Sequence, residues 1–150
     1  MDANQNDENG LYPFFTCSEN ELRINDYSFD CEAIIISGNG SKLGYTNYYN
    51  GKFNAYQRTY VLTGNQYFYI WYFSIKNNIM NIVNQAKGSA VPYITKPMLE
   101  NYEMYISNNE QLNTKINDIE KIVVNKISAN KNKLQRLHQL KRLYLKKFFG

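Results

Sequence analysis

The last part of the chain carries a regular apolar stripe that no glycine or proline interrupts before Gly150. From about Glu110 onward the apolar residues recur mostly at steps of three, four and seven, the a/d-type pattern of a coiled-coil helix. A helix over residues 112–147 would be roughly 54 Å long at 1.5 Å per residue. A small domain cannot cover so long a stripe, so we expect the helix to project and to pair with a partner helix. The residues expected to face the partner are Leu112, Ile116, Ile119, Val123, Ile127, Asn130, Leu134, Leu137, Leu140 and Tyr144.

The net charge of +4 is unevenly distributed along the chain. Residues 1–60 hold 8 acidic and 4 basic residues, residues 61–111 hold 3 of each, and residues 112–150 hold 2 acidic and 10 basic residues. The excess of positive charge therefore lies on the predicted helix. A protein that binds nucleic acid usually presents a basic face, so any such face on the N-terminal part must be local.

Length and composition suit one domain, or one domain with an appendage, because 150 residues with 43% hydrophobic side chains can form a core. The two cysteines, Cys17 and Cys31, come without a signal peptide or an apolar run long enough to cross a bilayer. We expect a reducing, cytoplasmic setting in which both thiols are free. A structural disulfide between them is the alternative.

Short extended runs separated by turns follow the first ten residues. Ala33–Ser37 is a mainly β-branched run, which predicts a strand that is covered on both faces. Gly38-Asn39-Gly40 ends this strand. Arg58–Leu62 predicts another strand, which Gly64 ends.

Asn50-Gly51 lies between two short extended runs, Tyr45–Tyr49 and Lys52–Asn54. An Asn-Gly pair favours the positive φ angles of a tight turn between antiparallel strands. We therefore expect a hairpin with its turn at Asn50-Gly51.

Residues 66–84 fit a strand by propensity, but the spacing of Ile75, Ile79 and Ile82 fits a helix. We favour a helix that breaks near Lys76–Asn78 and ends by Gly88. Its aromatic residues from Tyr67 to Phe73 are assigned to the core rather than to base stacking. Residues 89–108, with Pro92 and Pro97, predict a loop with short extended pieces.

These segments together predict an α+β fold. We expect a disordered arm over residues 1–10 and a small globular domain over residues 11–108, with a short-stranded mixed or antiparallel sheet and helices. A long coiled-coil helix over residues 109–150 follows.

No catalytic or cofactor-binding set is found in the sequence. The segment Gly38–Gly44 follows a strand, but it lacks the Gly-Lys-Ser/Thr ending of a phosphate loop and the third glycine of a dinucleotide fingerprint. With one histidine, His138, and two cysteines 14 positions apart, a zinc site is not expected. The acidic residues near the N-terminus show no metal-ligand spacing. We therefore expect no cofactor, no metal and no catalytic residue, and a small nuclease or ligase is the least supported class.

A polar cluster suited to binding surrounds the expected hairpin. Arginine pairs with guanine edges, asparagine and glutamine pair with adenine edges, and lysine pairs with phosphates or guanine. Polar residues beside a turn are more often solvated surface, so residue types alone favour that simpler interpretation. The cluster comprises Lys42, Tyr45, Tyr48, Tyr49, Lys52, Asn54, Gln57 and Arg58.

The order of several segments resembles the target-recognition domain of the DNA-specificity (S) subunit of Type I restriction-modification systems. Each segment is only moderately specific, but their order and spacing together are distinctive over roughly residues 10–150. The last one, Leu140–Phe149, is similar to the typical end of the family's spacer helix. The others are Gly10–Phe15, Asp26–Asp30, Ala33–Gly44, Gly51–Leu62 and Ala86–Ile94.

This resemblance implies a non-catalytic protein that reads half of a split DNA target. In the family, long helices set the distance between two recognition domains and hold the methyltransferase subunits, whereas methylation and cleavage belong to other chains. We expect one recognition domain and one long helix here, and only a short polar stretch precedes Gly10–Pro13, where the family usually has a strand and a helix before its Gly-x-Tyr-Pro segment. Two interpretations remain. In the first, the chain is a half-specificity subunit that dimerises through its helix, and antiparallel pairing would give a symmetric split target. In the second, it is a truncated remnant that acts only as a coiled-coil interaction protein.

When the family's DNA contacts are carried over to this sequence by position, they fall in loop 38–44, in the hairpin 45–58 and in loop 87–96. An alternative for Arg58 is an ion pair with Asp30 or Glu32 inside the fold. The expected partners are double-stranded DNA, a second copy of the chain, and the methyltransferase and restriction or translocase subunits. The candidate DNA-binding residues are Lys42, Lys52, Asn54, Gln57, Arg58, Lys87 and Ser89.

Overall fold

A computed structural model describes residues 7, 10–18, 22–85 and 92–149 of the chain. The chain divides between Ile106 and Ser107 into two compact units. The first combines a sheet with helices and the second is a single long helix, so the predicted α+β class is confirmed. Of the expected N-terminal arm, Asp7 is described, and its backbone N–H donates to the Arg23 carbonyl at 2.9 Å.

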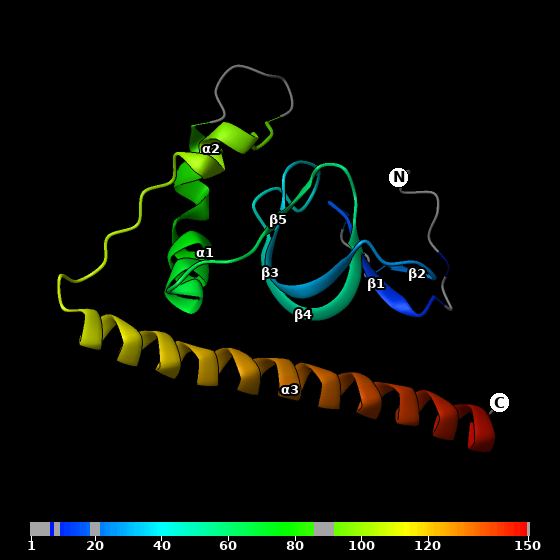
Figure 1. Cartoon of the computed structure of the whole chain (residues 1–150). Coiled ribbons are helices and arrows are strands. Elements are labelled where there is room, and N and C mark those ends of the chain that lie inside the picture. The colour runs from blue at the N-terminus through cyan, green and yellow to red at the C-terminus, as the bar shows by residue number, and fades with distance from the viewer. Residues whose placement is uncertain (1–6, 8–9, 19–21, 86–91, 150) are drawn as a thin grey trace. The chain divides into compact units, whose positions relative to one another are not determined.

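Five strands form one mixed sheet in the order β2-β1-β4-β3-β5 (Figure 1). The central strand β4 pairs in parallel with β1 and antiparallel with β3. The two remaining pairs, β1 with β2 and β3 with β5, are antiparallel. The strands are β1 (Tyr12–Phe15), β2 (Leu22–Ile24), β3 (Phe29–Ser37), β4 (Thr46–Ala55) and β5 (Thr59–Leu62).

The sheet is strongly curved. In register, Phe53 of β4 pairs with Phe29 at the start of β3, whereas Thr59 of β5 pairs with Ser37 at its end. An extended β3 would separate these points by roughly 26 Å at 3.3 Å per residue, and the short connection between β4 and β5 cannot span that length. β3 and β4 therefore bend through a wide arc, as Figure 1 shows, and β5 returns to the end of β3.

The expected hairpin at Asn50-Gly51 is wrong. β4 runs continuously through both residues, and Gly51 pairs with Cys31 of β3. Gly51 has a φ of 129°, which an L side chain rarely adopts. The glycine therefore lets a ten-residue strand bend, rather than reversing the chain.

The first unit buries residues on the sheet and on helix α1 (Phe68–Asn84), and its core cluster of Ala33, Ile35 and Phe53 lies on β3 and β4. Residues Ala33 to Ser37 of β3 are all buried, as their β-branched run predicts. On α1, Ile75, Ile79 and Ile82 share one buried face, so the predicted helix is confirmed.

The predicted break in this helix is wrong, because α1 passes through Lys76–Asn78 without interruption. Lys76 and Asn77 are exposed, and the Asn78 amide donates to the Ser74 carbonyl at 2.9 Å. Polar residues on the outer face interrupt the apolar sequence without interrupting the helix. The expected end at Gly88 lies outside the described residues.

A short helix, α2 (Lys96–Glu100), lies within the segment expected to be a loop, so that expectation is wrong over these residues. Pro97 occupies the first turn, where the missing N–H costs nothing. Leu99 is buried and anchors α2 to the first unit. The proline therefore marks the start of a helix here and not a loop.

One carboxylate ties α1 to the sheet. The Glu32 side chain on β3 accepts hydrogen bonds from the hydroxyl groups of Tyr48 on β4, at 2.7 Å, and of Tyr69 on α1. The Tyr48 ring also packs against Phe68, Tyr69 and Tyr72, with centroids 6.1 to 6.3 Å apart. Burial first, and then the bond to Glu32, raise the pKa of Tyr69 to about 12. Phe68, Tyr69 and Tyr72 are therefore in the core, as expected, whereas Tyr67, Trp71 and Phe73 are only half-buried.

The second unit contains the long helix α3 (Glu110–Phe149), which confirms the helix predicted from the stripe. It is continuous in Figure 1. The apolar stripe residues are exposed, from 37% at Ile116 to 61% at Ile119 and Tyr144. Their pattern therefore leaves a long apolar surface open to a partner.

Removing the Tyr69 hydroxyl should destabilise the first unit. Tyr69→Phe leaves Glu32 with one donor fewer, and a hydrogen bond to a charged group contributes about 1.5–3 kcal/mol. We expect the free energy of unfolding in urea to fall by about this amount. Tyr105→Phe, at a side chain that is 95% exposed, is the matched control and should change nothing measurable. Equal effects of the two changes would contradict the role of Glu32.

Candidate nucleic-acid interface

The curvature of the sheet brings four segments together at one end. The Gly38 N–H donates to the Arg58 carbonyl at 2.9 Å, and the Ile94 N–H donates to the Gly38 carbonyl at 2.8 Å. The Cys17 thiol lies 3.4 Å from the same Arg58 carbonyl, and Cys17 and Cys31 are both free thiols, as expected. We call residues 16–18, 38–45, 56–58 and 92–95 the loop cluster.

A second set of bonds fixes the strand ends beneath the cluster. The Tyr56 N–H donates to the Phe15 carbonyl at 2.8 Å, and the Tyr60 hydroxyl donates to the Ile94 carbonyl at 2.8 Å. The Ser37 N–H donates to the Tyr45 carbonyl at 3.0 Å, which closes loop 38–45 at its base. Segments from distant parts of the sequence are therefore held as one surface, mainly by backbone groups and in part by the Tyr60 hydroxyl and the Cys17 thiol.

Gly44 seats loop 38–45 against α1. Its φ is 78°, and a Cβ added there would lie 3.0 Å from Val83 and 3.2 Å from Ile79. Both the backbone conformation and the close approach to α1 therefore require glycine. The position of the loop thus depends on the helix behind it.

The loop cluster presents polar and aromatic side chains to solvent. Gln57 and Arg58 are exposed, and the Lys42 ammonium lies 4.8 Å from the centre of the Tyr45 ring. Tyr45 and Tyr93 are 51% and 46% exposed. A guanidinium, an amide and an ammonium group beside accessible rings can bind base edges and phosphates.

Tyr45 belongs to the polar cluster expected from the sequence but not to the candidate DNA-binding residues, and Tyr93 was covered only by the expected contact loop 87–96. Tyr93 is distant in sequence from loop 38–45, and only the bond between Gly38 and Ile94 brings it near. The one available signal was the resemblance of the segment Ala86–Ile94 to a family loop.

Lys52 belongs to a different place on the sheet. Its ammonium lies 4.6 Å from the centre of the Tyr27 ring, which in turn packs edge-on against Tyr12. The hydrogen bond to Tyr27 raises the pKa of Lys52. Lys52 therefore joins a separate patch with Tyr12 and Tyr27, and not the loop cluster.

Asn54 does not reach the surface. It is 1% exposed, its amide oxygen accepts the Ala55 N–H at 2.9 Å, and its amide nitrogen has no hydrogen-bond partner. A side chain so placed cannot contact a DNA base while the strand stays intact. Its assignment as a contact is therefore corrected.

Two further expectations concern residues near the cluster. Lys87 and Ser89 lie outside the described residues. Among the described residues, Arg58 makes no ion pair with Asp30 or Glu32, and Glu32 is instead bonded to two tyrosines. The Arg58 side chain is exposed, so the alternative of an internal ion pair is wrong.

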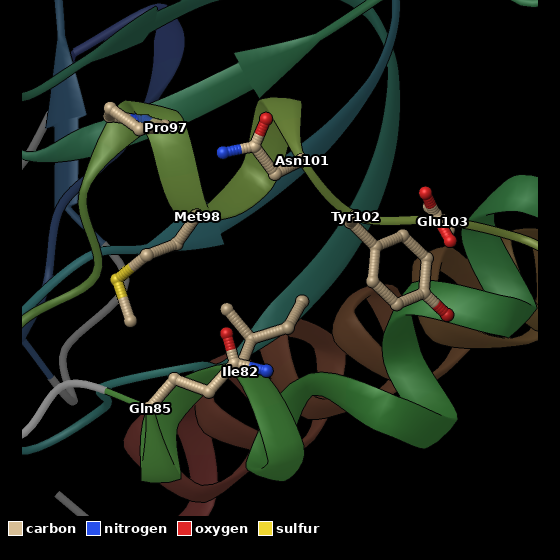
Figure 2. Close-up of a pocket in the computed structure, with 7 residues that line it drawn as sticks. All are labelled: Ile82, Gln85, Pro97, Met98, Asn101, Tyr102 and Glu103. Atoms are coloured by element: carbon tan, nitrogen blue, oxygen red, sulfur yellow. The ribbon is translucent and has the colours of Figure 1, made fainter.

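A pocket of about 350 Å³ lies between α1 and α2 (Figure 2), and none of the candidate DNA-binding residues lines it. It has an acidic residue and no cation in its lining, which suits neither phosphate nor nucleic acid. Within residues 7, 10–18, 22–85 and 92–149, no cluster of potential metal ligands occurs and no helix could span a membrane. The lining residues are Ile82, Gln85, Pro97, Met98, Asn101, Tyr102 and Glu103.

Comparison with known proteins gives one consistent result. The family model of the Type I restriction modification DNA specificity domain matches residues 1–139. The chain is 45% identical over 100 residues to the Type I restriction enzyme EcoDI specificity subunit of Escherichia coli, which covers 64% of this chain and 21% of that protein.

A similar fold occurs in the crystal structure of the S subunit of a Type I restriction-modification system from M. genitalium. The TM-score is 0.64 at 18% identity, and the match covers 97% of this chain and 38% of the other. The chain thus spans about a fifth of the curated relative and under two fifths of the solved subunit.

Gly44→Ala should destabilise the first unit by about 1–3 kcal/mol, because it adds backbone strain and crowds α1. Gly64→Ala is the matched control, since Gly64 also has a positive φ of 70° but nothing within 4 Å of an added Cβ. Gly64→Ala should lower the free energy of unfolding only by the contribution from backbone strain. Urea denaturation measures both, and a loss for Gly64→Ala as large as that for Gly44→Ala would contradict the seating of the loop on α1.

Proposed function

The chain belongs to the family of Type I restriction-modification DNA specificity domains, and on that premise we propose that it reads a DNA sequence and catalyses nothing itself. The observation that carries this proposal is the convergence of Lys42, Gln57 and Arg58 with two exposed tyrosines in one loop cluster. Specific DNA recognition needs donors and acceptors held in fixed positions on a rigid support. The backbone bonds beneath the cluster supply that support.

Each side chain has a distinct role in this proposal. Arg58 pairs with the O6 and N7 atoms of a guanine, and Gln57 pairs with the N6 and N7 atoms of an adenine. Lys42 contacts a phosphate or a guanine and is positioned by the Tyr45 ring. Lys52, Lys87 and Ser89 remain proposed contacts outside this central set.

We further propose that the chain is a half-specificity subunit that pairs with a second copy through α3. The exposed apolar stripe supports this, because a soluble monomer rarely leaves so long an apolar surface uncovered. Two copies would present two recognition units, each reading half of a split target.

The stripe also favours antiparallel pairing. A strict count of sevens from Leu112 meets leucine, isoleucine, lysine, lysine and leucine, so Lys126 and Lys133 border the stripe residues Ile127 and Leu134 near its centre. An in-register parallel pair would place each of these lysines opposite its own copy. An antiparallel pair centred on Ser128 instead places Lys126 opposite Asn130 of the second copy. The apolar ends of the stripe then face each other, and the two recognition units are related by a two-fold axis.

The expected partners beyond DNA are the methyltransferase and the restriction or translocase subunits, in which catalysis resides. The relatives that support this are named as subunits of a Type I restriction enzyme and of a Type I restriction-modification system. A function on cellular DNA implies a cytoplasmic location in a bacterium.

A second candidate function is that of a remnant that binds a coiled-coil partner and no longer reads DNA. Residues 1–106 carry 10 acidic against 7 basic residues, and this charge balance favours the remnant over a self-sufficient DNA binder. Formation of the partner complex without any salt-dependent DNA binding would select this function.

Arg58→Ala should weaken binding to the selected DNA sequence by about 5- to 150-fold, the effect of losing a base contact of roughly 1–3 kcal/mol. The target is first obtained by selecting bound duplexes from a randomised pool. Arg58→Lys keeps the charge but loses the bidentate geometry, so it should also relax specificity. Lys76→Ala, an exposed cation on α1, is the control. Unchanged binding of the Arg58, Gln57 and Lys42 variants would refute the site.

Leu137→Asp should convert the dimer into a monomer, because it buries a charge in the paired stripe. Leu143→Asp is the matched control on the same helix, at a side chain that is 65% exposed and lies off the stripe. Sedimentation or light scattering at micromolar concentration measures the mass. A strictly monomeric unmodified chain would contradict pairing through α3.

A further inference from the structure

The second half of α3 carries a continuous polar face. Its residues follow steps of four, three, four and four along the sequence, so they fall within about a quarter of the helix circumference. All of them are exposed, and none is acidic or apolar. We call this set the basic line: Lys131, Gln135, His138, Arg142 and Lys146.

The charge around the basic line is of one sign. No acidic residue follows Glu120, whereas nine lysines and arginines lie between Lys121 and Lys147. Residues 1–106 have a small excess of acidic residues, 10 against 7. The excess positive charge of the chain therefore lies on α3 and not on the unit that carries the loop cluster.

The basic line and the apolar stripe occupy different faces of the helix. Leu137, Leu140 and Tyr144 lie roughly 100° or more around the axis from every residue of the basic line, whereas Ile127 and Leu134 border it at steps of three or four. A helix that binds a partner along the stripe thus leaves the basic line in solvent. Both surfaces can be occupied at once.

We propose that the basic line binds the phosphates of duplex DNA without regard to sequence. From Lys131 to Lys146 the line is roughly 22 Å long, about two thirds of a turn of B-form DNA, over which each strand carries a phosphate every 3.4 Å. Lysine, arginine and glutamine side chains are donors that phosphate oxygens accept. This inference rests on the proposed function, in which DNA is already bound by the loop cluster.

DNA is favoured over an acidic protein surface by the division of charge within the chain. The phosphate contacts of a DNA-binding protein supply most of its sequence-independent affinity. The recognition unit has no net positive charge to supply that affinity. The second half of α3, which has no acidic residues, carries an excess of positive charge. The loop cluster then selects the sequence, and the basic line contributes the salt-dependent binding energy.

The test is the triple variant Lys131→Gln, Arg142→Gln and Lys146→Gln of the full chain. Binding of a duplex of several helical turns is followed by fluorescence anisotropy over a range of salt concentrations. Each lost phosphate contact should reduce the slope of log K against log salt by about 0.9, so three contacts reduce it by nearly three per chain. The loss should be equal for selected and random duplexes.

The matched control is Lys115→Gln, Arg136→Gln and Lys147→Gln, which removes the same charge from another side of the helix. It should change the slope far less than the first triple variant. Equal slopes for the unmodified chain and the first variant, or equal reductions by both variants, would overturn the proposal. An unaltered slope with loss of methyltransferase binding would overturn it in favour of a protein partner. If the unmodified chain selects no sequence at all, the proposed function fails instead, whatever the slope.

Discussion

The backbone hydrogen bond from Gly38 to the Arg58 carbonyl closes a curved sheet on which the rest of the first unit depends. It joins the end of β3 to the connection between β4 and β5, and the Gly38 carbonyl accepts the Ile94 N–H in turn. Because these groups are main-chain atoms, they fix where the loops lie without constraining which side chains the loops display. A recognition surface can then change its residues while its support stays the same.

The sequence was informative where a pattern had only one physical solution. Helix α3 and strand β3 were predicted correctly, because a long seven-residue repeat indicates a helix and a short β-branched run ended by glycine indicates a strand. Asn50-Gly51 was misleading because a glycine with positive φ serves equally in a reversal and in a bent strand. Only the pairing of Gly51 with Cys31 distinguishes them. The polar residues Lys76–Asn78 misled for a related reason, since an exposed helix face looks like an interruption.

The candidate site was predictable in part. Lys42, Gln57 and Arg58 lie within a short stretch of sequence, so residue types and resemblance were enough to group them. Tyr93 joins them through contacts between distant segments, which one sequence does not encode in any local pattern. The prediction that Asn54 contacts DNA was wrong for another reason. Asn54 follows the buried Phe53 and is itself buried, so alternation along β4 breaks down at the strand end, where both faces are covered.

The polar residues near the centre of α3 weaken its apolar stripe and would affect how two such helices pair. Replacing Lys126, Asn130 and Lys133 with leucine would extend the apolar contact and strengthen any pairing. It would also reduce the difference in energy between parallel and antiparallel arrangements, since the polar layers that help to distinguish them would be lost. In the proposed dimer, antiparallel helices would be related by a two-fold axis perpendicular to them, and the two recognition units would then read opposite strands of a split target. In the proposed dimer, the lysines and the asparagine would weaken the pairing while favouring one orientation of the two helices, and that orientation would set the spacing and direction of the two half-sites.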